Sequence, residues 1–91
     1  MIVYNKMYLK DIVVKKEYFP RARLNEDAIK RYMDLYNLDR IIDPIIVQKE
    51  KLILIDGFHR YEAQKRLGRE EVEVKLMDIP EAEIFITSMK L

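Results

Sequence analysis

One short run of the sequence combines residue types that can bind and neutralise a phosphate. Residues 55–60 read Ile-Asp-Gly-Phe-His-Arg, at the point where an apolar run ends and a helical pattern begins. The first amides of a helix have no partner within the helix, and the helix dipole makes them attractive to anions. Gly57 allows close approach of the backbone, and Arg60 adds a forked cation that suits phosphate. The run therefore predicts a phosphate-binding turn built from the amides of Gly57, Phe58 and His59, with Arg60 beside them.

Each residue of this turn also has a purely structural interpretation. Gly57 could serve only a tight turn, and His59, which the helical spacing directs inward, could fill a polar niche of the fold. Phe58 is expected to point outward, where it could stack on a ligand or cover it. The carboxylate of Asp56 could cap the same amides, or it could orient Mg²⁺ or an acceptor hydroxyl group. The combination of a glycine, a histidine and an arginine in one turn favours the functional interpretation.

Basic residues upstream extend this prediction. Arg21 and Arg23 lie in a polar loop over residues 15–24, and we expect them to contribute positive charge to the phosphate site. The alternative is that this basic loop binds nucleic acid, with the domain acting as a non-catalytic DNA-associated adaptor. The net charge is only +1, which excludes a strongly basic nucleic-acid coat. The second helix carries further cations interleaved with acids, which is typical of a mixed solvated face; they are Lys65, Arg66 and Arg69 with Glu62, Glu70 and Glu71.

Composition removes several other chemistries. The chain has 91 residues, one histidine and no cysteine. A disulfide framework and a cysteine nucleophile are therefore excluded, and a conventional zinc site is not expected. The length predicts a single domain over residues 1–91. Apolar runs are too short to cross a bilayer, so we expect a cytoplasmic protein without membrane association. The high charged fraction, 36%, resembles that of thermophile proteins.

The elements that position the turn follow from periodicity. We predict an early strand or extended segment over 8–14, a helix that starts after the cap Asn25, a hairpin over 45–55, a helix over 57–67, a strand over 72–76 and a helix from Pro80. The apolar stripe of the first helix is Ala28, Ile29, Tyr32, Leu35 and Tyr36, and that of the last is Ala82, Phe85, Ile86 and Met89. Together these predict a small α/β (α+β) domain with a mixed sheet of about four strands and about three helices.

The run over residues 55–68, from Ile55 to the Leu-Gly pair that ends the helix, resembles the signature of the ParB/sulfiredoxin superfamily. Phe-Pro-Arg at residues 19–21 is similar to the element ahead of the first helix in ParB proteins, and Asp-Pro-Ile-Ile-Val at 43–47 is similar to the strand that follows it. The resemblance covers nearly the whole chain. It implies a ParB-like N-terminal domain that binds a nucleotide at this turn and forms a homodimer.

The branches of this superfamily imply different activities. Sulfiredoxins use ATP and a cysteine where this chain has Phe58, so their sulfur chemistry is excluded. ParB proteins bind and hydrolyse CTP and partition chromosomes or plasmids; their DNA specificity comes from a later helix-turn-helix, so we expect no sequence-specific DNA binding from these residues. ParB-like serine kinases carry a similar turn and a glutamate base, for which Glu17 is the candidate. The resemblance thus implies CTP, ATP or ADP with Mg²⁺, with Glu17 and Asp56 as candidate catalytic groups for hydrolysis or phosphotransfer.

Overall fold

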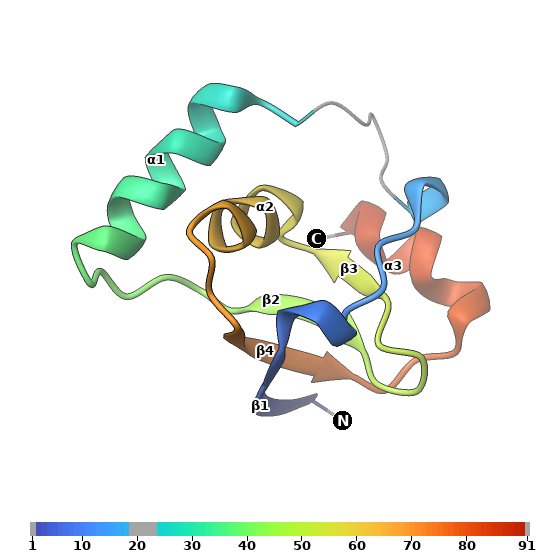
Figure 1. Ribbon diagram of the computed structural model, residues 1–91. Coiled ribbons are helices and arrows are strands. Elements are labelled where there is room, and N and C mark those ends of the chain that lie inside the picture. The colour runs from blue at the N-terminus through green and yellow to red at the C-terminus, as the bar shows by residue number, and fades with distance from the viewer. Residues whose placement is uncertain (1, 19–23, 91) are drawn as a thin grey trace.

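The fold is a mixed sheet with helices on both of its faces (Figure 1). The computed structural model describes residues 2–18 and 24–90. Its strands are β1 (Ile2–Tyr8), β2 (Ile45–Gln48), β3 (Leu54–Asp56) and β4 (Glu71–Met77), and its helices are α1 (Glu26–Asn37), α2 (Phe58–Arg66) and α3 (Ile84–Lys90). Single 3₁₀ turns lie at Leu9–Asp11, Lys16–Tyr18 and Glu81–Glu83. The predicted fold class is confirmed.

The four strands lie in the order β1-β4-β2-β3. Strand β4 pairs antiparallel with β1 and parallel with β2, and β2 and β3 form the predicted antiparallel hairpin. The parallel pair needs a long crossover, and the chain makes it through β3 and α2. This topology places the start of α2 directly after the edge strand β3.

The hairpin is apolar at successive positions because both of its faces are covered. Ile45, Val47 and Leu54 belong to one apolar cluster, against which residues of α2 pack. Ile46, Ile53 and Ile55 belong to a second cluster, which Ile84 of α3 completes. Since neighbouring side chains of a strand point to opposite faces, α2 and α3 must lie on opposite sides of the sheet.

Helix α1 forms an outer layer that lies along α2 (Figure 1). Asn25 is the predicted cap, and its Oδ1 accepts a hydrogen bond from the Ala28 amide at 3.1 Å. The predicted stripe is confirmed, because Ile29 is fully buried and the other four residues of the stripe are half-buried. Two further contacts tie α1 to α2, from Glu26 to Arg66 and from the Asn25 amide to His59.

Two details of the predicted elements were wrong, namely the position of the first strand and the apolar stripe of the last helix. The first strand runs over Ile2–Tyr8, not over residues 8–14, because Leu9 and Ile12 enter the core from a 3₁₀ turn rather than from a strand. In the last helix Ile84 is the buried residue, whereas Phe85 and Ile86 are 47% and 56% exposed. The α-helix begins at Ile84, after a 3₁₀ turn, and this start rotates the buried stripe away from the predicted one. Of the other two residues of the predicted stripe, Ala82 is exposed, and the side chain of Met89 lies outside the described part.

None of the helices in the described ranges combines the length and the apolar character that crossing a bilayer would require.

Candidate functional site

The predicted turn connects the end of β3 to the first residue of α2, and Gly57 is its pivot. Gly57 has φ +92°, a left-handed conformation that disfavours any residue with a side chain. A Cβ at this position would lie 2.8 Å from Ile45 Cγ2 and 3.0 Å from Arg60 Nη2. Gly57 is also the N-cap of α2 and provides no side-chain hydrogen bond to its first turn. Residue 57 must therefore be glycine for the fold itself, and its own position contributes no side chain that competes with a ligand for the first-turn amides.

The Arg60 side chain is mostly buried at this turn. The side chain is 14% exposed, and its guanidinium donates a hydrogen bond from Nη1 to the carbonyl oxygen of Asp43 at 2.9 Å. Its Nη2 lies 3.4 Å from Oδ2 of Asp56, one helical turn earlier. Arg60 thus fastens the loop before β2 to the start of α2, and it places a fixed positive charge beside Gly57 rather than a mobile one on the surface.

His59 joins the starting points of the two helices. Its Nε2 accepts a hydrogen bond from the backbone amide of Asn25 at 3.0 Å, and the ring is half-buried. The accepting nitrogen carries no proton in this arrangement. Asn25 follows the predicted basic loop, whose Arg21 and Arg23 lie outside the described residues. The inward direction predicted for His59 is confirmed.

Phe58 does not point outward as predicted. It is half-buried and packs against the apolar cluster beneath α2. Tyr61, three residues later, packs against the same cluster, and α1 lies along another side of α2, so the side of the helix that was expected to face solvent faces the sheet. The ring is therefore part of the packing that seats the helix, and only the Phe58 amide stays a candidate for ligand binding.

The two candidate carboxylates lie in different surroundings. Asp56 is 42% exposed and ends β3 beside Arg60, so it borders the turn. Glu17 is exposed in the 3₁₀ turn Lys16–Tyr18, whose neighbouring side chains bond to Glu81 rather than to α2. The structure thus brings Asp56 to the turn through Arg60, and it places Glu17 on a segment held by a different group.

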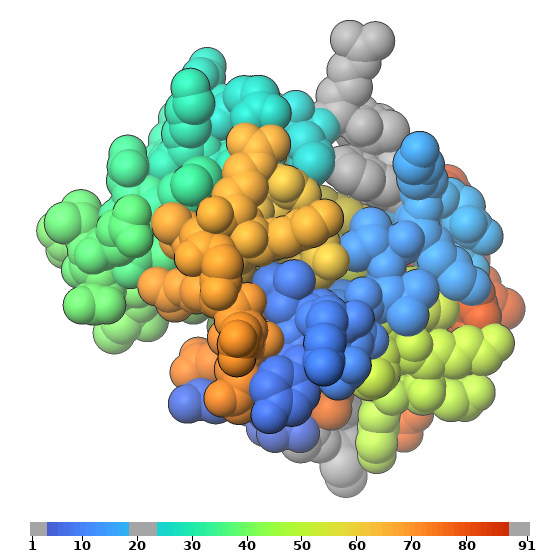
Figure 2. Space-filling view, in the orientation of Figure 1, coloured from blue at the N-terminus to red at the C-terminus, as the bar shows by residue number. Residues whose placement is uncertain are grey.

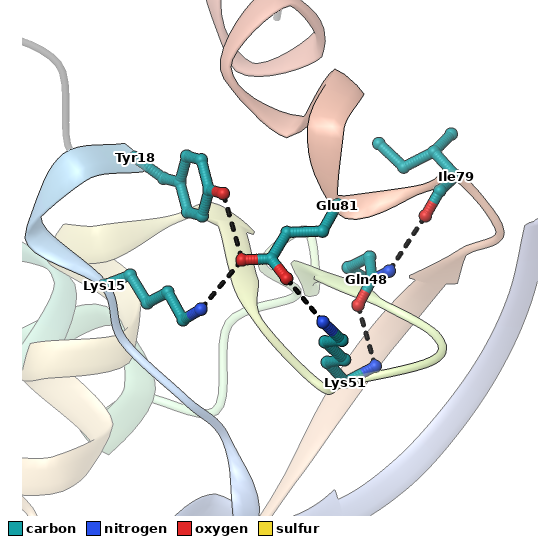
Figure 3. Close-up of polar contacts among 6 residues, drawn as sticks. All are labelled: Lys15, Tyr18, Gln48, Lys51, Ile79 and Glu81. Atoms are coloured by element: carbon teal, nitrogen blue, oxygen red, sulfur yellow. Dashed lines mark hydrogen bonds and ion pairs between the residues drawn. The ribbon is translucent and has the colours of Figure 1, made fainter.

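That group is a cluster of three donor side chains around the carboxylate of Glu81, and the sequence did not predict it (Figure 3). Glu81 accepts hydrogen bonds from Lys15 Nζ at 2.7 Å, Lys51 Nζ at 2.8 Å and the Tyr18 hydroxyl at 3.1 Å. These donors, with that of Lys15 the largest cause, lower the pKa of Glu81 to about 2. The four residues, named here the Glu81 cluster, join the first part of the basic loop to the hairpin turn and to the 3₁₀ turn before α3.

A buried amide supports the same region. Gln48 is 1% exposed; its Nε2 donates to the carbonyl oxygen of Ile79 at 2.9 Å, and its Oε1 accepts from the Lys51 amide at 2.8 Å (Figure 3). The polar residue within the apolar run at 45–48 was the one available signal for this contact, since a buried amide must find partners.

The basic face of α2 is largely paired within the molecule. Arg66 donates to both carboxylate oxygens of Glu26, at 2.6 and 3.0 Å, and to Glu62 at 3.0 Å, and these bonds raise its pKa. Arg69 donates to the carbonyl oxygen of Tyr36 and lies 5.0 Å from the centre of its ring. These pairings support the interpretation of a mixed face rather than of a surface reserved for a phosphate backbone.

A cavity of about 410 Å³ lies beside loop 39–44 and the C-terminal half of α2. Charged side chains of both signs line it, among them Lys6, Arg40, Asp43 and Arg69. Its lining residues include none of residues 56–60, so it is not the predicted phosphate site.

Similar proteins place this fold in a known group. The family model of the ParB N-terminal domain matches residues 5–90. A ParB-like protein from Sulfolobus acidocaldarius is 27% identical over 71 residues, which are 78% of this chain and 36% of that protein. The chain thus spans about a third of the length of this curated relative.

Solved structures agree on the fold. The Pnob8-like ParB-N domain matches with a TM-score of 0.80 at 18% identity, over 97% of this chain and 34% of that one. Truncated ParB from Caulobacter crescentus, complexed with CTP-γ-S, matches at 0.79 and 13% identity over 96% of this chain and 51% of that one. Sulfiredoxin from Arabidopsis thaliana matches at 0.72 and 24% identity, over 100% of this chain and 99% of that one. Because the family model covers nearly the whole chain, this protein belongs to the ParB N-terminal domain family.

Proposed function

We propose that this domain binds a nucleoside triphosphate, with the phosphates at the first turn of α2. The observation that carries the proposal is the N-cap: Gly57 is left-handed and without a side-chain cap, and the fixed charge of Arg60 lies beside it. Amides at a helix start favour anions, and a neighbouring guanidinium strengthens that preference. Membership in the ParB N-terminal family, one member of which has been solved with CTP-γ-S, supports the choice of a nucleotide.

The residues of the turn have distinct roles in this proposal. The amides of Gly57, Phe58 and His59 face the phosphates, and Arg60 supplies charge from within the fold while it holds the loop at Asp43. Arg21 and Arg23 supply further positive charge in this proposal, because they precede Asn25, whose amide bonds to His59. Asp56 borders the turn and is exposed enough to reach a phosphate-bound Mg²⁺, which commonly uses one or two carboxylates together with phosphate oxygens.

Hydrolysis or phosphotransfer would require little more from the protein than this arrangement. Phosphoryl transfer depends mainly on positioning and on stabilisation of charge. Asp56 is the better placed of the two candidate carboxylates, because its oxygen lies 3.4 Å from Arg60. Glu17 would act only if the segment of the Glu81 cluster brings it to the bound nucleotide.

A thermal-shift screen tests binding. CTP, ATP and ADP, each with Mg²⁺, are added to the wild-type domain, with Mg²⁺ alone and with inorganic phosphate as controls. A ligand that binds only the folded state raises the melting temperature with its concentration. We expect a triphosphate to raise it more than phosphate does; no shift with any nucleotide would refute the proposal for this domain.

Variants then locate the site. Arg21→Ala with Arg23→Ala should remove most of the nucleotide-induced shift, measured from the variant's own melting temperature without ligand. Arg31→Ala, an exposed arginine of α1, is the matched control and should leave the shift intact. An equal loss of shift in the control would mean that general charge, rather than this loop, governs binding.

A further inference from the structure

The two edges of the sheet differ in whether another segment of the chain pairs with them. Beyond β3, residue 13 pairs in parallel with Ile53, and the amide of Leu54 donates to the carbonyl oxygen of Val13 at 2.8 Å. This bridge covers the start of the β3 edge. Strand β1 has seven residues, and no strand of the described ranges pairs with its outer edge. In Figure 2 the N-terminal segment, in blue, lies at the surface of the molecule. An open edge of this length is a template for pairing with another strand.

The hydrogen bonds show which groups this edge offers. The amide of Leu9 donates to the carbonyl oxygen of Glu70 at 2.8 Å, in the same register as β1 and β4, so odd-numbered residues of β1 bond toward β4. Even-numbered residues then direct their backbone groups outward. The Lys6 amide agrees with this, because it donates to the Oδ1 of Asn5 at 2.8 Å and not to β4. The free edge thus presents the backbone groups of Tyr4, Lys6 and Tyr8.

The sequence of β1 complements itself about Asn5. If a second copy pairs antiparallel with Asn5 opposite Asn5, then Tyr4 of each copy lies opposite Lys6 of the other. An ammonium group beside an aromatic ring is attracted to it, and Tyr4, 67% exposed, already has Lys75 Nζ at 5.6 Å from its ring centre. Centring the pair on Lys6 instead would place two lysines opposite each other, which is unfavourable.

We propose that β1 is a dimerisation edge, which pairs with β1 of a second copy of this chain in the antiparallel register centred on Asn5. In this register Tyr4 and Lys6 of opposite copies form a hydrogen-bonded pair and exchange two backbone hydrogen bonds, twice per dimer. The Asn5 side chain satisfies the Lys6 amide in the monomer and releases it when the strands meet. The result is one continuous sheet through both copies, and the helix α2 of each copy takes no part in the contact between them.

A single cysteine tests the register directly, since the chain has none of its own. In the proposed dimer the two Asn5 residues form a non-hydrogen-bonded pair, whose Cα atoms lie roughly 4.5 Å apart, within the range that a disulfide spans. Asn5→Cys should form a disulfide-linked dimer under mild oxidation. Asn37→Cys, an exposed position at the end of α1, is the matched control and should crosslink far more slowly. Equal rates for the two variants would overturn the proposal.

Charge at position 4 provides a second, non-covalent test by sedimentation equilibrium. Tyr4→Glu places a carboxylate opposite Lys6 of the other copy and should strengthen the dimer, whereas Tyr4→Lys should weaken it. From the usual energies of cross-strand pairs, counted twice, the dissociation constants of the two variants should differ by about tenfold. Tyr8→Glu and Tyr8→Lys carry the same changes of net charge but face the uncharged position 2, so they should differ little.

Two results contradict the proposal. One is a wild-type chain that stays monomeric up to its limit of solubility. The other is a difference between the position 8 variants as large as that between the position 4 variants, because net charge rather than the register would then control association. Far-ultraviolet circular dichroism and melting curves confirm that each variant is folded before it is compared.

Discussion

The turn at residues 56–60 and the Glu81 cluster both hold charged side chains in place, but they are assembled in opposite ways. In the turn, Asp56, Gly57 and Arg60 are close in the sequence, and Arg60 makes its strongest contact with a backbone carbonyl. In the Glu81 cluster, Lys15 and Lys51 come from segments far from Glu81, and each contact joins two side chains. The turn therefore depends on backbone conformation, whereas the cluster depends on ionisation. Variants can separate these two dependences.

The largest effect should come from Gly57→Ala. The new Cβ meets Ile45 Cγ2 at 2.8 Å and the residue keeps φ +92°, so both overpacking and backbone strain oppose folding. We expect the free energy of unfolding to fall by about 3 kcal/mol in urea denaturation. Gly68→Ala is the control: φ is +74°, but nothing lies within 4 Å, so strain alone should cost about 1 kcal/mol. Equal losses would show that the close approach to Ile45 is unimportant.

Arg60→Ala should have the next largest effect. It removes a hydrogen bond from a mostly buried guanidinium to the Asp43 carbonyl and leaves that loop without its anchor to α2. A loss of about 2 kcal/mol is expected from a hydrogen bond to a charged donor. Urea denaturation measures it, with Arg31→Ala as an exposed arginine that should change stability little. If both variants are equally stable, Arg60 does not hold the turn.

Glu81→Gln should change how the stability of the protein depends on pH. This change should be larger than any change of pH dependence in the turn variants. The pKa of Glu81 is lowered to about 2 in the folded state, so its contribution is present above its ordinary pKa, 4.5, and is lost as the pH falls toward about 2. The wild-type melting temperature should therefore fall more steeply across this window than that of Glu81→Gln. Glu83→Gln, in the same 3₁₀ turn, is the control and should keep the wild-type slope.

The smallest effect is expected for Glu26→Gln, which breaks the ion pair between α1 and α2. Glu26 is 61% exposed, and exposed pairs contribute little and are screened by salt. The melting temperature should fall slightly at low ionic strength and match the wild type at high ionic strength. Asp27→Gln is the control beside it. A large loss that persists in salt would mean that this pair, and not packing at Ile29, holds α1.

Local patterns predicted the features that depend on neighbouring residues. The Asn25 cap, the inward His59, the hairpin and the end of α2 before Gly68 all depend on residues within one or two turns of the chain, where spacing carries the information. The outward direction assigned to Phe58 was wrong because α2 packs against both the sheet and α1, which the local sequence does not show. The stripe assigned to α3 failed because a 3₁₀ turn shifts the start of that helix.

Contacts between distant segments could not be predicted in the same way. In the Glu81 cluster, the two lysines lie 66 and 30 positions from Glu81 in the sequence. Lysines and glutamates are so common in this chain that no sequence pattern identifies these residues as partners. Arg66 was assigned to the solvent face, yet it meets Glu26, 40 positions away. Such pairs exist only once α1 has been laid along α2, which is a property of the tertiary fold.

The hydrogen bond between Asn25 and His59 has a consequence for ligand affinity. It holds Asn25, on the C-terminal side of the segment that carries Arg21 and Arg23. On the N-terminal side, the hydrogen bond from the Tyr18 hydroxyl to Glu81 holds Tyr18. Folding has therefore already met most of the entropic cost of closing that segment into a loop, a cost that a free chain would have to meet on binding. The proposed contacts of Arg21 and Arg23 with an anion then depend on a segment whose two flanks the fold already holds, so modest contacts can yield useful affinity.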